Sequence, residues 1–438
     1  MEGSTAWLGW LVQGAGHELM LFASVGILLF GLDDLLFDAL WFGAGRARRD
    51  AVRGRNPVSG TVAVFVPAWR EAAVLPATLT HILRSWDGED VRLYVGCYPN
   101  DAATLMAVAP LVARDRRVRL VIGPAAGPTT KGDNLNRMWH ALGEDERAEG
   151  RRFAAVVLHD AEDRVHPAEI ALYRVHLAQD AMVQIPVVPH YEPGQRWIGG
   201  HYADEFAEAH GKELALRSRL LGMLLDAFGL SARFVDAVDG DGTRIVSRGE
   251  FPARVEAAAR QKARWVVGIA LAGWDHVAWP AARPDDGPRG ASRAWAARWM
   301  LWRDRRAPLA AIVILAAYIG MILAGLAMAG EALFGWSAVD IGDTLRWLLA
   351  FNAVVLLWRL SMRFLFTARC YGLRAGFAAV PRAFVANLIA VLAARRAIAC
   401  YWTMQRGGWS GTRPITPPSR LRVPCSFPKH GCGESHGL

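Results

Sequence analysis

A cluster of carboxylates follows a short apolar run in the middle of the chain. The run, residues 153–158, has the pattern of a strand buried on both faces of a sheet. Asp160, Glu162 and Asp163 come directly after it, where open α/β sheets place their ligands. Grouped acidic oxygens suit Mg²⁺ or Mn²⁺, and such a cation suits a diphosphate. The alternative is a strand-to-helix turn in which Asp160 or Asp163 caps a helix that starts near Pro167.

Three other predicted strands also lead into polar residues. Apolar runs alternate with segments of helical pattern, so right-handed crossovers should join the strands into a parallel sheet. Parallel topology gathers the carboxyl ends of the strands at one edge. Each polar residue alone is ordinary loop chemistry, but a shared edge makes the set a candidate site. The predicted strands cover residues 61–66, 91–95, 118–122 and 154–158, and the polar residues after them are Glu71, Asp101, Lys131 and Asp160.

An amide, a guanidinium and an indole lie within one turn of a later predicted helix. Gln261 and Trp265 are four residues apart and share a face, with Arg264 beside them. Together these groups suit phosphates and sugar rings. The alternative is ordinary helix packing with one exposed arginine.

Three aspartates precede this helix, beyond a long amphipathic helix predicted at residues 201–230. Asp236, Asp239 and Asp241 fall in a turn-rich segment, where aspartate often accepts hydrogen bonds from nearby backbone. A solvated hairpin accounts for them without any catalytic role. Further upstream, Gln184 follows a short predicted strand.

The composition favours a membrane protein. The chain has 438 residues, enough for one α/β domain and several membrane segments. It is 53% hydrophobic, and its mean hydropathy of +0.16 is high for a soluble enzyme. The net charge is +9, but the arginines gather beside apolar segments, which favours a membrane surface over nucleic acid as the partner. Five scattered cysteines imply no disulfide framework.

Several segments could meet the bilayer. Clusters of arginine flank the first two predicted spans, so the positive-inside rule places these flanks in the cytoplasm and the N-terminus outside. Arg359 and Arg363 in the third span are expected to snorkel to the cytoplasmic interface. Residues 377–402 are too polar to span comfortably, and they are predicted to lie as helices along the inner surface. The three predicted spans are residues 20–42, 308–330 and 344–366.

These features predict four parts of the chain. The N-terminal transmembrane helix covers residues 1–43, and a cytoplasmic α/β domain covers residues 60–280. A C-terminal membrane region with two spans and interfacial helices covers residues 293–402. The tail, residues 407–438, is rich in Pro, Arg, Ser and Gly and is predicted to be disordered.

The motifs, taken in this order, resemble a membrane-bound glycosyltransferase of family 2, with the GT-A fold of cellulose and hyaluronan synthases. A closer likeness is to the glycosyltransferase region of the bacteriophage N4 adsorption protein B group, from about residue 33 to residue 406. The resemblance implies an α/β, GT-A-like, mostly parallel sheet domain flanked by transmembrane helices. The motifs that carry it are Tyr98-Pro99-Asn100-Asp101, Lys131-Gly132-Asp133-Asn134-Leu135-Asn136, His159-Asp160-Ala161-Glu162-Asp163, Arg260-Gln261-Lys262-Ala263-Arg264-Trp265 and Val380-Pro381-Arg382.

The same resemblance implies roles for individual residues. Glu71 and Asp101 would line the nucleotide pocket, with Lys131 near the nucleotide. Asp160 and Glu162 would match the family's Asp-x-Asp and hold Mg²⁺ or Mn²⁺ on the diphosphate. Gln261, Arg264 and Trp265 would match the Gln-x-x-Arg-Trp that grips the diphosphate and the acceptor sugar.

One expected motif is missing. Family members carry a general base in a Thr-Glu-Asp or Glu-Asp motif before Gln-x-x-Arg-Trp, and no such pair occurs between Asp163 and Gln261. We infer an internal deletion near Leu230–Ser231. Either transfer is impaired, which we favour, or Asp236, Asp239 or Asp241 substitutes as the base. The tail also departs from the group's usual ending, and a shifted reading frame is one hypothesis for it.

The sequence therefore predicts a multi-pass glycosyltransferase of the bacterial inner membrane with a cytoplasmic catalytic domain. It would move a sugar from a nucleotide-sugar donor to a polysaccharide or lipid-linked acceptor, with polysaccharide export proteins as further partners and no nucleic acid. The alternative is a non-catalytic, nucleotide-binding membrane scaffold of a polysaccharide or phage-adsorption assembly.

Overall fold

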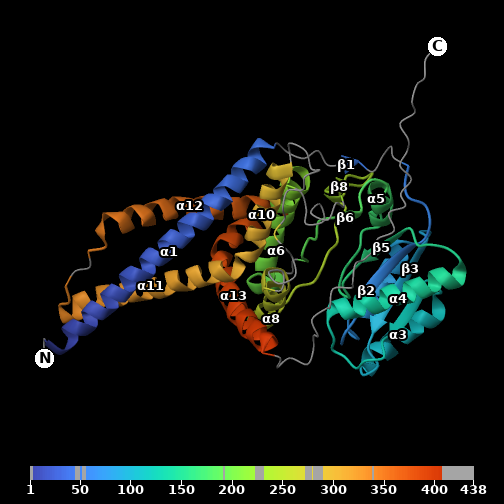
Figure 1. Ribbon diagram of the computed structural model, residues 1–438, viewed down its shortest axis with the longest axis horizontal. Helices are drawn as coiled ribbons and strands as arrows, with labels where there is room; N and C mark the ends of the chain where they lie inside the picture. The colour runs from blue at the N-terminus through green and yellow to red at the C-terminus, as the bar shows by residue number, and fades with distance from the viewer. Residues whose placement is uncertain are drawn as a thin grey trace, which may run out of the picture.

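The protein combines an α/β domain with a bundle of long helices (Figure 1). The structure is a computed structural model, and it describes residues 3–44, 50–51, 56–190, 193–221, 231–271, 279, 290–337 and 340–406. The predicted tail, the arginines between residues 46 and 55, and the Leu230 side of the inferred deletion lie outside the described residues.

Four parallel strands form the central sheet. The order β4-β3-β2-β5 places β2, the first strand of this sheet along the chain, in the interior of the sheet. Strands β2 and β5 are in register from the pair Val62 and Ala155 onward. This confirms the predicted α/β class with a mostly parallel sheet. The strands are β2 (Val62–Pro67), β3 (Val91–Cys97), β4 (Val118–Ile122) and β5 (Ala155–Leu158).

Helices cover both faces of this sheet. Alternate residues of β2 point to opposite faces. Val64 packs with Leu79 of α2 in one cluster, whereas Phe65 packs with Met138 of α4 in the other. Full burial of each such side chain contributes about 1.5–3 kcal/mol. The helices of this layer are α2 (Leu75–Ser85), α3 (Ala102–Arg114) and α4 (Lys131–Glu149).

Strand β5 differs from its prediction. Val157 is buried, but the side chains of Val156 and Leu158 are 41% and 48% exposed. The prediction of a strand buried on both faces was therefore wrong. Strand β5 pairs with β2 at the edge of the sheet, and α4 lies over the sheet's inner strands.

Shorter elements follow β5. Two parallel strand pairs join distant parts of the chain: β1 (Asp50–Ala51) pairs with β8 (Ala237–Val238), and β6 (Met182–Gln184) pairs with β7 (Ala232–Phe234). Gln184 is thus the last residue of a strand. Helix α5 covers Glu169–His176, and a 3₁₀ turn covers Pro193–Gln195.

The predicted long helix after Trp197 contains irregular turns. It begins as α6 (Ile198–Glu208), continues through a π-helical turn (Ala209–Glu213) and α7 (Leu214–Leu216), and ends its described part in a second π-helical turn (Arg217–Leu221). The rest of its predicted range, residues 222–230, lies outside the described residues. Helix α8 (Val255–Trp265) also continues into a π-helical turn (Val266–Leu271).

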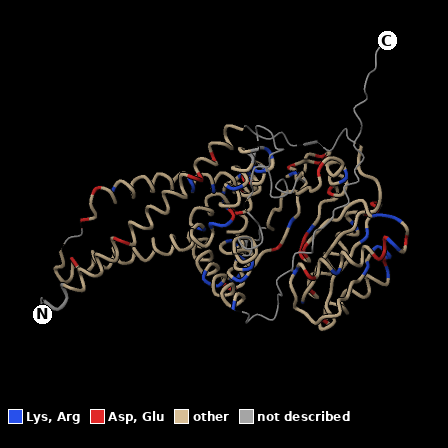
Figure 2. The backbone as a smooth tube through the Cα atoms, viewed as in Figure 1, with Lys and Arg blue, Asp and Glu red and all other residues tan. Residues whose placement is uncertain are grey.

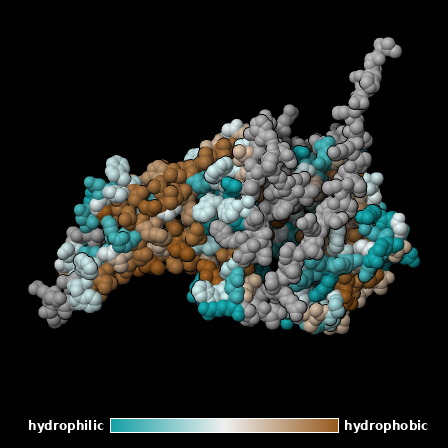
Figure 3. Space-filling view, in the orientation of Figure 1, coloured by the Kyte–Doolittle hydropathy of each residue, from teal (hydrophilic) through white to brown (hydrophobic). Residues whose placement is uncertain are grey.

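Four helices in the described part of the chain are long and apolar enough to cross a membrane. The helices α1, α11 and α12 form an arm that leads away from the α/β domain, and its surface is largely hydrophobic (Figures 1 and 3). The start of α1, the end of α11 and the start of α12 share the far end of the arm. The four helices are α1 (Gly3–Gly43), α11 (Ala307–Phe334), α12 (Gly342–Tyr371) and α13 (Leu373–Gln405), with α10 (Gly290–Arg305) directly before α11.

Helix α13 corrects one part of the prediction for residues 377–402, namely that several helices cover them. That the segment lies along the membrane surface stays a prediction. Helix α13 is one continuous helix with Pro381 inside it, and by length and composition it is a fourth candidate span. Its charged residues were the reason to reject a span, but Arg382 is fully buried against Asp204. In Figure 1 the helix runs across the direction of α1, α11 and α12.

Charged residues gather where the arm meets the rest of the protein (Figure 2). Arg359 lies 3.0 Å from Glu208 and 3.6 Å from Asp34, so its charge is paired within the protein. That Arg359 and Arg363 lie at the cytoplasmic interface stays a prediction. Lys212 is buried between Asp38 and Glu208. Opposite charges on α1, α6 and α12 thus supply the partners that lipid does not.

Candidate functional site

The loops after β2 and β3 are tied together by Asp101. Its carboxylate accepts a hydrogen bond from the backbone N–H of Arg70 at 2.6 Å and caps α3 through Thr104 N–H at 3.4 Å. The Thr104 hydroxyl in turn accepts from Glu71 N–H at 3.0 Å. Arg70 has a φ of 60°, which is uncommon for a residue with a side chain. These bonds hold the strained turn that presents Glu71, as is common at functional sites.

Lys131 is the first residue of α4. A reciprocal capping box starts this helix: the Thr130 hydroxyl accepts from Asp133 N–H at 3.0 Å, and the Asp133 carboxylate accepts from Thr130 N–H at 3.1 Å. The Lys131 ammonium forms an ion pair with Asp160, and both side chains are about half exposed. The ends of β4 and β5 therefore meet through this pair.

A buried charged group supports the loop after β5. Asp163 accepts from Asp160 N–H at 3.1 Å and lies 3.1 Å from His159 Nδ1. His159 Nε2 lies 2.9 Å from Glu169, which also accepts from the Tyr173 hydroxyl at 2.9 Å. Burial opposes a charged ring, but Glu169 and Asp163 outweigh it and raise the pKa of His159 to about 10.

This arrangement contradicts the helix-capping alternative. Helix α5 starts at Glu169 with Ala168 at its N-cap and no side-chain cap, whereas Asp163 folds back onto the loop itself. Asp160 points its charge to Lys131. Neither aspartate is used to begin the helix.

The grouped acids repel one another. Burial, followed by Asp160 and Asp163, raises the pKa of Glu162 to about 7. Burial, followed by Asp101 and Asp160, also raises the pKa of Glu71. Lys131 pairs with Asp160 alone among these acids, and an added divalent cation would relieve the remaining repulsion. Residues of this kind fit Mg²⁺ or Mn²⁺.

The protein alone would not complete such a cation's coordination. Among the described residues, no three His, Cys, Asp or Glu side chains are grouped as metal ligands. Mg²⁺ commonly takes one or two carboxylates from a protein and its other ligands from phosphates and water. Asp160 and Glu162 could serve in that way.

Comparison with known proteins decides the class of the domain. Residues 59–226 match the family model described as glycosyltransferase like family 2. This part of the chain is a family 2-like glycosyltransferase domain. Over 86% of its length the chain is 28% identical to Bacteriophage adsorption protein B of Escherichia coli (strain K12). It is equally similar to Bacteriophage N4 adsorption protein B of Escherichia coli O157:H7. The chain spans 58% of the length of these relatives. The resemblance stated from the motifs is confirmed.

A solved structure also overlaps this chain. It is the mannosyltransferase PcManGT from Pyrobaculum calidifontis in complex with GDP-Man and Mn²⁺. The overlap covers 84% of this chain and 99% of that chain, at 18% identity and a TM-score of 0.41. A likeness this distant says nothing about the site or its ligands.

The structure brings five of the predicted site residues together and places three others on a separate helix. Glu71, Asp101, Lys131, Asp160 and Glu162 share one edge of the sheet, as described above. Gln261, Arg264 and Trp265 lie on α8, where Trp265 packs against Tyr202 and Phe206 with ring centroids 6.0 and 6.1 Å apart.

One segment links α8 to the acidic loop of the family 2-like domain. Arg164 and Arg248 exchange two backbone hydrogen bonds, at 2.7 and 2.9 Å. A Cβ atom on Gly249 would lie 3.4 Å from the Asp163 carboxylate, so its backbone packs closely there. Phe251 then reaches Tyr202, with ring centroids 4.8 Å apart. The two parts of the predicted site are thus connected through Gly249 and Phe251.

Two of the three proposed substitute bases, Asp236 and Asp239, are held by other groups, whereas Asp241 is exposed. Asp236 accepts from Arg244 Nε at 2.6 Å. Asp239 accepts from the backbone N–H groups of Asp241 and Thr243 at 3.0 and 2.8 Å, which closes a turn between Val238 and Arg244. This agrees with the solvated hairpin. Asp239 also lies 3.5 Å from His166 Nε2.

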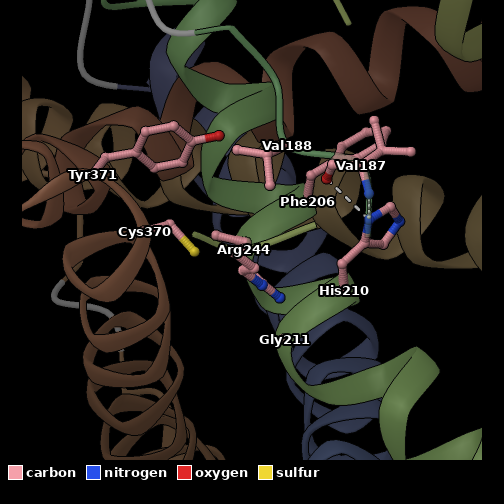
Figure 4. A pocket seen from close by; sticks show the side chains of 9 residues that line it. Val187, Val188, Phe206, His210, Gly211, Arg244, Cys370 and Tyr371 are labelled. Atoms are coloured by element: carbon pink, nitrogen blue, oxygen red, sulfur yellow. Dashed lines mark hydrogen bonds between the residues drawn. The ribbon is translucent and has the colours of Figure 1, made fainter. Parts of the chain in front are cut away.

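A small pocket lies elsewhere, between the first π-helical turn and the end of α12 (Figure 4). His210 Nδ1 faces Val187, whose N–H donates to it at 2.7 Å. The lining includes none of the residues predicted from the motifs. It consists of Val187, Val188, Phe206, Ala207, His210, Gly211, Arg244, Cys370 and Tyr371.

Sequence reasoning missed the residues that support the acids. Arg70 and Thr104 donate to Asp101. His159 and Glu169 hold Asp163, which in turn accepts from Asp160 N–H. The spacing of Asp101 and Thr104 is an N-cap signal that could have been found. The pair of His159 and Glu169 gave no such signal, because it depends on how α5 docks.

Cation binding should depend on pH near neutrality. A cation competes with the proton on Glu162, whose pKa is about 7, so Mn²⁺ affinity should rise as the pH rises from 6 to 8. In the absence of the cation, the folding stability should change with pH in the opposite direction. The raised pKa contributes stability that is lost as the pH rises through 7. Calorimetric Mn²⁺ titrations at several pH values test this. Glu162→Gln should flatten the dependence, and a pH-independent affinity in the wild type would contradict it.

Proposed function

We propose that the family 2-like domain binds a nucleotide sugar at the acidic edge of its sheet. Asp160 and Glu162 would hold Mg²⁺ or Mn²⁺ on the diphosphate, and Lys131 would lie beside it. The cation would neutralise the charge that develops on the leaving diphosphate. Glu71 and Asp101 would line the rest of the nucleotide pocket. The observation that carries the proposal is the ion pair of Lys131 with Asp160, beside Glu162 with its raised pKa.

The position of the α/β domain at one end of the membrane arm supports a cytoplasmic location for this chemistry. The α/β domain lies on the side of the arm where α1 ends and α11 begins (Figure 1). In the sequence, arginines follow α1 and precede α11. The positive-inside rule then favours the cytoplasmic side of the bacterial inner membrane. The acceptor would be a polysaccharide or a lipid-linked sugar near the bilayer, and polysaccharide export proteins would be further partners.

Sugar transfer would be impaired in this chain. A general base must lie within hydrogen-bond reach of the acceptor hydroxyl. The family's base motif is missing from the sequence, and Asp236 and Asp239 are held by Arg244 and by a turn. This favours a second candidate function, a nucleotide-binding membrane scaffold without turnover.

Turnover by purified protein separates these functions. With Mn²⁺ and a panel of radiolabelled nucleotide sugars, we expect nucleotide binding but transfer at least about 100-fold below that of a family member with the base motif, because a misplaced group costs about that much. Asp236→Asn and Asp239→Asn should not change the residual rate. Rapid transfer that either substitution abolishes would refute impairment, and absence of nucleotide binding would refute the proposed site.

A further inference from the structure

We propose that Asn100 is a positioning residue that sets nucleotide affinity by holding the loop before Lys131. This inference rests on the proposed function, because it assigns Asn100 an effect on the diphosphate through Lys131. Asn100 follows β3, whereas the loop, residues 123–130, follows β4 and leads directly into α4. The side chain therefore joins two neighbouring strand ends.

The carboxamide of Asn100 pairs with the backbone of Gly127 on both sides. Its Nδ2 donates to the Gly127 carbonyl at 2.8 Å, and its Oδ1 accepts from Gly127 N–H at 2.7 Å. These two hydrogen bonds satisfy the backbone N–H and the carbonyl of Gly127, which lies in an irregular loop. Asn100 is exposed, so its side chain could hydrogen-bond to water. It bonds to the backbone of the loop instead. The result is a two-point attachment that also fixes the amide orientation.

The loop backbone rests on an aromatic surface beneath this attachment. A Cβ atom on Gly127 would lie 2.6 Å from the Trp69 ring and 2.7 Å from the Tyr98 ring, so only glycine fits. The two rings meet edge to face with centroids 5.1 Å apart. Tyr98 also shares a hydrogen bond with the Thr129 hydroxyl at 2.9 Å. The loop is thus held by hydrogen bonds from Asn100 and by packing against the rings of Trp69 and Tyr98.

Little freedom is left between this anchor and Lys131. Pro128 follows Gly127 and has a restricted φ. Thr129 is bonded to Tyr98, and Thr130 is fixed by the capping box with Asp133. The next residue is Lys131, whose ammonium pairs with Asp160. Releasing Gly127 would let the start of α4 shift, and a shift of about 1 Å at a charged contact costs substantial binding.

A double-mutant cycle with Lys131 tests this inference. The probes are Mn²⁺ with whichever of UDP and GDP binds the full-length protein more tightly, measured by calorimetry in detergent. We expect Lys131→Ala and Asn100→Ala each to weaken binding by roughly 10-fold, with little further loss in the double variant, because residues that act through one contact are not additive. Asn56→Ala, an exposed asparagine before β2, is the matched control and should bind like the wild type.

The outcomes separate the two proposals. If the wild type binds neither nucleotide, the proposed function fails and this inference fails with it. If Lys131→Ala weakens binding but Asn100→Ala does not, or if the two losses multiply, Asn100 does not act through Lys131. Should Asn100→Ala unfold, Asn100→Asp replaces it. An aspartate keeps the acceptor for Gly127 N–H and loses the donor to its carbonyl. We therefore expect an intermediate loss of nucleotide affinity, and little further loss when Asn100→Asp is combined with Lys131→Ala.

Discussion

Replacing Asp160 with asparagine is expected to weaken Mn²⁺-dependent nucleotide binding by at least about 100-fold. Loss of a residue that only hydrogen-bonds to a metal ligand already costs about 10- to 100-fold in metal affinity, and Asp160 would be a direct ligand. Asparagine keeps the shape of the side chain but removes the charge that a hard cation needs. The substitution also frees Lys131 from its present carboxylate partner. Nucleotide affinity without a cation should therefore hold or rise slightly, since the ammonium becomes available to the phosphates.

Calorimetric titration of UDP and GDP, with Mn²⁺ and with a chelator, measures both effects. Asp241→Asn makes the same chemical change in the exposed hairpin turn and should leave binding unchanged. Equal affinities of wild type and Asp160→Asn in Mn²⁺ would remove this carboxylate from the cation site. A loss that is just as large in chelator would point to damage to the loop instead.

The sheet was largely predictable because its signals are local. Alternation of apolar runs with helical segments fixes a parallel topology, and β4 begins and ends at the predicted residues. Parallel topology also predicted that Glu71, Asp101, Lys131 and Asp160 would meet. The exposure of Val156 and Leu158 was not predictable, since it depends on which strand lies at the edge of the sheet.

Long-range charge pairs were beyond the reach of sequence periodicity. Arg359 and Arg382 look like poor residues for membrane helices when each is considered alone. Their partners, Glu208 and Asp204, lie on α6, more than a hundred residues earlier in the chain. Nothing local marks such a pair. The same holds for Lys212, which is buried against Asp38 of α1.

Through these pairs and its aromatic contacts, α6 connects the long apolar helices to the acidic loop. Helix α6 contributes Tyr202 to the contacts of Trp265 and Phe251, and through Phe251 and Gly249 it connects to the acidic loop. It also contributes Asp204 and Glu208 to the membrane helices. The orientation of the acidic loop relative to the long apolar helices therefore depends on a few buried ion pairs as well as on apolar packing.

Replacing Arg382 with methionine is expected to destabilise the protein by about 3–5 kcal/mol, because it leaves a buried carboxylate without its counter-ion. Arg382 and Asp204 are both fully buried, and their two hydrogen bonds measure 2.8 and 2.5 Å. The guanidinium also donates to the carbonyls of Ala375 and Arg196 at 2.9 and 3.1 Å. A thermal midpoint in detergent should fall by roughly 10 °C.

A second substitution distinguishes the lost pair from lost packing. Adding Asp204→Asn to Arg382→Met removes the stranded charge, so the double variant should be more stable than Arg382→Met alone. The exposed pair of Arg346 with Asp343, at 2.9 Å, provides the matched control, and Arg346→Met should barely change the midpoint. If Arg382→Met were as stable as the control, the contact between α6 and α13 would rest on apolar packing, and the buried pair would not hold the domain against the membrane helices.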